Sequence, residues 1–138
     1  MDSDDFYTVA RQLARGRSVA ELRAAVSRYY FGLYNAAFSF VQRLPPRQGE
    51  LRGDSDDHKA VRGLLIKVGA RDVAGALQTL RLARNKADYE NEYPGDEDFR
   101  RFAAPAIEEA ESGLKALRAV SLDEARARYE QINMAGPR

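Results

Sequence analysis

Apolar residues recur at the three- and four-residue spacing of an α-helix along almost the whole chain. No alternating run of β-branched residues is long enough to indicate a strand. The sequence therefore predicts an all-α fold, which we expect to be an up-and-down bundle of four to five helices plus a short C-terminal helix. Residues 1–120 make up the predicted bundle, and residues 121–138 make up the short C-terminal helix and tail.

The longest predicted helix begins after Ser18, which can cap it, and runs to about Leu44. It carries two neighbouring apolar stripes, the first formed by Leu22, Val26, Tyr29, Leu33, Ala37, Phe40 and Leu44, and the second by Tyr30, Tyr34, Phe38 and Val41. Both stripes need to be covered, and a chain of this length has few other helices to cover them. We therefore expect this helix to lie at the centre of the bundle or in a dimer interface, and we predict a homodimer.

The other predicted helices are bounded by capping residues and by glycine or proline. The first helix begins at Asp2, Ser3 or Asp4 and stops near Gly16. The third helix runs from Asp54 or Ser55 to Gly69, and the fourth starts at Asp72. The fifth helix contains Pro105, and Ser121 caps the last helix. Gly63, Gly75 and Gly113 lie inside helical patterns, where we expect close packing between helices.

Composition excludes several kinds of site. The 138 residues include no Cys and one His, which excludes disulfides, thiol nucleophiles, and Cys-ligated or all-His metal sites. Asp54, Asp56 and Asp57 lie at a predicted helix start, where the helix dipole favours acids, so we predict no metal. No glycine pattern matches a phosphate-binding loop, and we predict no cofactor. No stretch has the length and apolarity of a membrane span, so we expect a cytoplasmic protein with no membrane partner.

The predicted fourth helix carries a polar patch formed by Arg81, Arg84, Asn85, Asp88 and Tyr89. These residues lie on adjoining turns, so two guanidinium groups, an amide, a carboxylate and a phenol come together. Arg84 also occupies an apolar seam position, where a charged side chain needs a hydrogen-bonded partner. We expect Asp88 or Asn85 to hold the guanidinium, and we expect Arg84 to face an acid, a phosphate or a second subunit.

The single His58 lies at the start of the predicted third helix, behind Asp56 and Asp57. Its pKa near neutrality suits a general base. A solvated or capping histidine is the plainer interpretation of such a position. On that interpretation we expect His58 to be exposed and dispensable for folding.

Three stretches resemble the signature motifs of the HEPN domain family. They are RAAVSRYYFGLYNAA at 23–37, DHKAV at 57–61, and LRLARNKADY at 80–89. The resemblance covers roughly residues 5–118 and is strongest to a bacterial and archaeal subgroup with an S-R-x-Y-Y helix and an R-x-x-A-D-Y helix. Relatives of this kind are often paired with a small nucleotidyltransferase in toxin–antitoxin or defence systems.

The resemblance implies a dimeric bundle whose active members are metal-independent ribonucleases. Their catalytic motif is Arg, a polar residue that is usually Asn, a short spacer and then His. Arg84 and Asn85 match the first two positions, whereas Asp88 and Tyr89 stand where the His is expected. A carboxylate is a weak base at its usual pKa and a phenol is almost fully protonated, so His58 is a further candidate for the missing base.

Three functional hypotheses follow from these residues. In the first, the chain is a dimeric binding module that recognises RNA, a nucleotide or a partner protein through Arg81, Arg84, Asn85 and Arg28. In the second, it is a metal-independent endoribonuclease in which Arg84 acts with His58, Asp88 or Tyr89. In the third, it is a structural helical adaptor.

Overall fold

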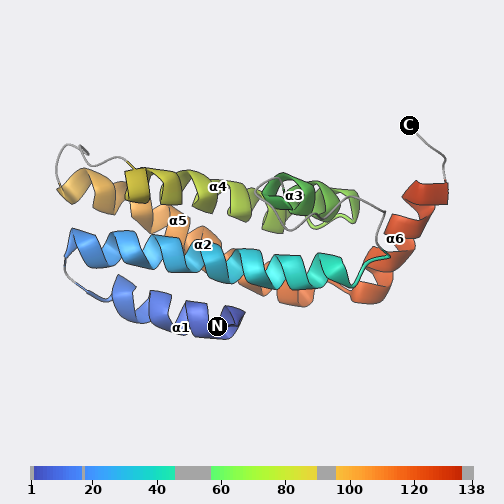
Figure 1. Ribbon diagram of the computed structural model, residues 1–138, viewed down its shortest axis with the longest axis horizontal. Coiled ribbons are helices and arrows are strands. Elements are labelled where there is room, and N and C mark those ends of the chain that lie inside the picture. Colours follow the sequence, from blue (N-terminus) through green and yellow to red (C-terminus); the bar gives the residue numbers. More distant parts are fainter. Residues whose placement is uncertain (1, 17, 46–56, 90–95, 135–138) are drawn as a thin grey trace.

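The computed structural model describes residues 2–16, 18–45, 57–89 and 96–134, and in these ranges the protein is an all-α helical bundle (Figure 1). The helices of the described ranges are α1 (Ser3–Ala14), α2 (Val19–Gln42), α3 (Asp57–Lys67), α4 (Arg71–Tyr89), α5 (Asp96–Ala119) and α6 (Leu122–Met134). The predicted fold class is therefore confirmed. Asp54 and Ser55, the predicted start of α3, lie outside the described residues.

The first two helices begin at the predicted capping residues. The Asp2 carboxylate accepts a hydrogen bond from the backbone N–H of Asp5 at 2.9 Å, and the Asp5 carboxylate accepts one from the backbone N–H of Asp2. This reciprocal pair is a capping box. Ser18 caps α2 by accepting a hydrogen bond from the backbone N–H of Glu21 at 3.1 Å.

The long helix α2 lies at the centre of the bundle, packed against α1, α3, α4 and α5 (Figure 1). Its second apolar stripe is largely covered within one chain, because Tyr30 and Val41 are buried and Tyr34 and Phe38 are half-buried. One chain therefore covers most of the second stripe, contrary to the expectation that a chain of this length has too few helices to do so. The predicted homodimer stays a prediction, without that support.

A polar network joins α1 to α2 and α5. Arg11 donates two hydrogen bonds to the Glu111 carboxylate, at 2.9 and 2.8 Å, and the Tyr29 hydroxyl donates a third at 3.1 Å. The Arg11 hydrogen bond holds the pKa of Glu111 below its usual range. The buried Tyr7 hydroxyl donates to the backbone carbonyl of Ala110 at 2.6 Å. These contacts fix α1 on the face of α2 opposite to the site described below.

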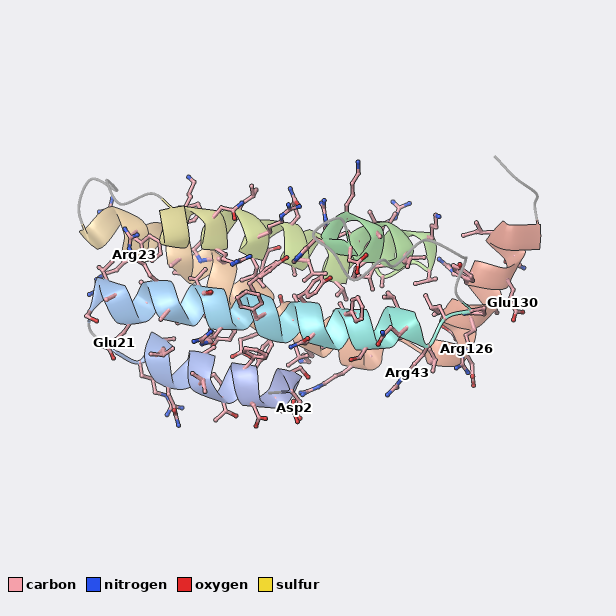
Figure 2. All side chains as sticks on the ribbon, viewed as in Figure 1. Asp2, Glu21, Arg23, Arg43, Arg126 and Glu130 are labelled. Carbon is pink, nitrogen blue, oxygen red and sulfur yellow. The ribbon has the colours of Figure 1, made fainter. Side chains whose placement is uncertain are left out.

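The last helix lies across one end of the bundle at a steep angle (Figure 1). Ser121 caps it as predicted, accepting a hydrogen bond from the backbone N–H of Glu124 at 3.3 Å. Its Ala125 and Tyr129 are buried. Arg126 donates from Nε to the backbone carbonyl of Arg43 at 3.0 Å, and Figure 2 shows both residues at this end of the molecule.

The three glycines for which close packing is predicted, Gly63, Gly75 and Gly113, differ in what surrounds them. A Cβ atom at Gly113 would lie 2.7 Å from the Ala76 Cβ and 3.2 Å from a Leu33 methyl, which confirms the predicted close packing. A Cβ at Gly63 or Gly75 would meet nothing within 4 Å. The prediction of close packing within the chain is therefore wrong for Gly63 and Gly75.

We expect Gly113→Ala and Gly75→Ala to change stability in opposite directions. The first forces a methyl group against Ala76 and Leu33, and overpacking of this kind costs about 1–3 kcal/mol. The second enters open space and removes a helix-interior glycine, which stabilises by roughly 0.5–1 kcal/mol. Urea unfolding of the two variants measures both changes in the free energy of unfolding. If both changes have the same sign and size, the packing described for α4 and α5 is contradicted.

Candidate functional site

The helical hairpin of α3 and α4 positions the only histidine of the chain. Val61, Leu64 and Leu65 form the buried face of α3. Gly69 then turns the chain with a φ of 86°, in the left-handed region that glycine tolerates, and α4 runs back along α3. The start of α3, with His58, consequently lies beside the second half of α4.

His58 packs against the second apolar stripe of α2. Its ring is stacked on that of Tyr34, with centroids 4.2 Å apart, and its Nδ1 is hydrogen-bonded to the Tyr30 hydroxyl. The prediction of an exposed histidine that is dispensable for folding is therefore wrong about exposure, since the side chain is half-buried. Asp57 is also more than a solvated helix-start acid, because it is buried, with 2% of its surface exposed.

Arg84 lies on the same face, reached from α4. Its guanidinium carbon is 4.6 Å from the ring centroid of Phe31 and 5.4 Å from that of Tyr30. Both distances are in the range of cation–π contacts. The side chain is half-buried, which agrees with the predicted seam position between α2 and α4.

The electrostatics of this region are dominated by arginine. Burial lowers the pKa of His58, and the positive charges of Arg81, Arg84 and Arg62 lower it further, against the opposing effect of Asp57. Burial raises the pKa of the Tyr30 hydroxyl to about 12, although Arg81 and Arg84 oppose this change. At neutral pH the imidazole is therefore uncharged and the phenol is protonated. We call Tyr30, Tyr34, His58, Arg62, Arg81 and Arg84 the His58 cluster.

The hydrogen bond between Tyr30 and His58 is compatible with two tautomers of the imidazole. If the Tyr30 hydroxyl donates to Nδ1, Nε2 carries a proton and can donate to an anion. If Nδ1 carries the proton and donates to the Tyr30 oxygen, Nε2 holds a free lone pair and can accept a proton. The first tautomer suits binding of a phosphate, and the second suits general base catalysis.

The other predicted site residues are distributed differently. Arg81 belongs to the His58 cluster, and Asn85 is exposed on α4. Asp88 and Tyr89 lie in the last turn of α4, but their side chains lie outside the described part of the structure. Arg28 is exposed on α2, two positions before Tyr30 and so about 200° round the helix from it, which separates it from the cluster.

Sequence reasoning missed Tyr30, Tyr34 and Arg62 as members of the site. The sequence pattern places the two tyrosines in an apolar stripe, and the pattern of a single helix does not show stacking on a histidine. Arg62 offers a clearer signal, since it lies four positions after His58 and so on the same face of α3.

Comparisons with protein-family models, with curated proteins and with solved structures found no match to this chain. The resemblance to HEPN domains therefore rests on the sequence motifs. Within the described ranges, none of the helices has the length and apolarity needed to cross a membrane. The same ranges contain no group of three or more His, Asp or Glu side chains arranged to hold a metal ion.

Proposed function

We propose that this protein is a HEPN-like module that binds the phosphodiester backbone of RNA at the His58 cluster. The observation that carries the proposal is the convergence of Arg62, Arg81 and Arg84 on the uncharged His58–Tyr30 pair. Among the described residues, Arg62, Arg81 and Arg84 act on His58 with positive charge, and the buried Asp57 acts on it with negative charge. A group of partly desolvated guanidinium side chains favours an anion that accepts several hydrogen bonds, and a phosphate does so.

The aromatic part of the cluster favours RNA over free inorganic phosphate. Tyr34 is half-buried and stacks on His58, and Phe38 follows it along α2, with ring centroids 5.9 Å apart. Single-stranded RNA is recognised largely by stacking of unpaired bases on aromatic side chains next to cationic ones. The partly accessible aromatic surface beside the arginines fits that mode of recognition.

Metal-independent RNA cleavage is a second candidate function, favoured by the neutral state of His58 beside two arginines. In this reaction Nε2 of His58 removes the proton of a ribose 2′-OH, and the resulting oxygen attacks the adjacent phosphorus. The bond to the 5′-oxygen of the next nucleotide breaks, and that leaving oxygen takes up a proton from solvent. Arg81 and Arg84 stabilise the charge that develops on the phosphate oxygens.

We expect Arg81→Gln to weaken RNA binding uniformly across sequences, because a phosphate contact positions the strand without reading bases. Each lost phosphate contact should reduce the magnitude of the slope of the logarithm of the binding constant against the logarithm of the salt concentration by about 0.7 for a single strand. Fluorescence anisotropy with 2′-O-methyl RNA, which cannot be cleaved by this route, measures both quantities. Lys115→Gln is the matched control, since it removes one exposed positive charge from α5. Equal effects of the two substitutions would contradict the proposed site.

The proposal also covers the oligomeric state, the cellular location and the biological system of the protein. We propose that the module forms a homodimer, that it acts in the cytoplasm, and that it belongs to a toxin–antitoxin or defence system, with a nucleotidyltransferase as a candidate partner. These statements rest on the resemblance to HEPN domains. The structural adaptor of the third hypothesis would bind no RNA, so the anisotropy experiment separates it from the other two.

A further inference from the structure

A shallow groove runs between α3 and α4 on the side of the His58 cluster that lies toward the hairpin turn. Its volume is about 510 Å³, and it is lined by Arg62, Ile66, Arg71, Ala74, Gly75 and Gln78. We call it the α3–α4 groove. Arg62 belongs to both the groove and the His58 cluster, so the two features adjoin.

The groove contains buried polar atoms whose hydrogen-bonding capacity the described chain does not use. Nε of Arg62 and Oε1 of Gln78 are buried, and neither has a hydrogen-bond partner among the described residues. Leaving such atoms unsatisfied destabilises the folded state, and the effect is larger for a charged group. Because the side chains of Arg62 and Gln78 both line the groove, this unused hydrogen-bonding capacity lies beside it and favours a ligand that supplies the complementary groups.

The two walls of the groove continue the rows of side chains that form the His58 cluster. His58, Arg62 and Ile66 succeed one another at four-residue spacing along α3. On α4, Arg71 and Gln78 lie in the groove, and Arg81 follows Gln78 one turn later. Arg71 and Arg84 are thirteen positions apart, about 20 Å along the helix axis, which exceeds the reach of a single nucleotide.

Two further features suit a polynucleotide. Gly75 leaves open space above the backbone of α4, so a ligand can approach that backbone closely. Ile66 is 49% exposed and offers an apolar surface between the two arginines of the groove.

We propose that the α3–α4 groove is a second RNA subsite, so that the ligand is a single strand of several nucleotides that runs from the His58 cluster toward Arg71. This inference rests on the proposed function. Arg71 contacts a second phosphate, Gln78 and Arg62 hydrogen-bond to a nucleotide, and a base packs on Ile66. A mononucleotide or dinucleotide occupies the His58 cluster alone.

The test compares a 2′-O-methyl dinucleotide with an octanucleotide by fluorescence anisotropy. We expect wild-type protein to bind the octanucleotide at least about tenfold more tightly. Arg71→Gln should remove most of that gain and reduce the salt slope for the octanucleotide by about 0.7, without changing dinucleotide binding. Gln78→Leu should also weaken octanucleotide binding, by about fivefold or more. Its melting temperature should stay the same or rise, because an apolar group replaces an unsatisfied amide.

The possible failures are distinguishable. If the octanucleotide binds no better than the dinucleotide, or if Arg71→Gln changes both affinities no more than Lys115→Gln does, the second subsite is wrong while the proposed function stands. If wild-type protein binds neither RNA, both proposals are wrong. If Gln78→Leu raises the melting temperature and leaves octanucleotide affinity unchanged, Gln78 has no ligand and the base contact assigned to it is wrong.

Discussion

Replacing Arg84 by Leu is expected to lower RNA affinity by at least about tenfold while the protein stays folded, because a hydrogen bond to a charged group is worth about 1.5–3 kcal/mol. The guanidinium lies over Phe31 and Tyr30, at a seam position of the kind that Leu usually occupies in a helical bundle. Replacing a whole buried ion pair by apolar groups is often neutral or stabilising, whereas removing one partner of such a pair is destabilising, so a large loss of stability would identify Arg84 as a structural ion-pair member. Thermal unfolding and anisotropy on the same samples therefore separate a binding role from a structural one.

Arg84→Lys is the matched variant for this experiment. Lysine keeps the positive charge but loses the planar fork that contacts two phosphate oxygens at once. We expect an affinity between those of the wild-type and Leu proteins, with a salt slope close to that of the wild type. Wild-type affinity in Arg84→Leu would mean that Arg84 serves only the packing of α4 on α2.

The fold was predictable because each of its determinants is local. Helical periodicity places Val61, Leu64 and Leu65 on one buried face of α3, and side-chain oxygens cap α1 and α2 as expected. The seam position of Arg84 could be read in the same way, since it follows Leu77 and Leu80 in the pattern of a single helix. Such features need no knowledge of which helices meet.

The candidate site depends on contacts between helices, and this is where the prediction failed. The polar neighbours of His58 in the sequence indicate an exposed side chain, but the second apolar stripe of α2 covers it through Tyr30 and Tyr34. The two relevant signals, an apolar stripe that needs to be covered and a histidine at a helix start, lie in different helices. Only the α3–α4 hairpin, packed on α2, brings them together.

The largest expected effect concerns the cleavage hypothesis: His58→Gln should reduce the rate of RNA cleavage by about 10²–10⁴-fold, the usual contribution of a general base. Binding of uncleavable 2′-O-methyl RNA should fall far less, since Arg81 and Arg84 remain. If the wild-type and His58→Gln proteins cleave RNA at the same rate, His58 is not the base. If wild-type protein binds RNA but does not cleave it, the cluster serves binding alone.

The dependence on pH provides a second test of the same residue. Burial and the nearby arginines lower the pKa of His58 from 6.5, so the base stays unprotonated at neutral pH and the cleavage rate should fall only below pH 6.5. Because Arg81 lowers this pKa, Arg81→Gln should move the acid limb of the pH–rate profile to higher pH. The depressed pKa also makes folding stability fall as the pH drops from 6.5 toward the folded-state pKa, since the unfolded chain binds the proton more readily.

Tyr30→Phe then decides between the two tautomers of His58. In the catalytic tautomer the Tyr30 oxygen accepts the Nδ1 proton and holds Nε2 ready as a base, so its removal should lower the cleavage rate and leave RNA affinity nearly unchanged. In the binding tautomer the Tyr30 hydroxyl donates to Nδ1, and Nε2 therefore carries the proton that it donates to phosphate. Removal of the Tyr30 hydroxyl should then lower RNA affinity instead of the cleavage rate. His58 is therefore a base or a phosphate ligand according to which of the two measurements responds to the loss of one hydroxyl group.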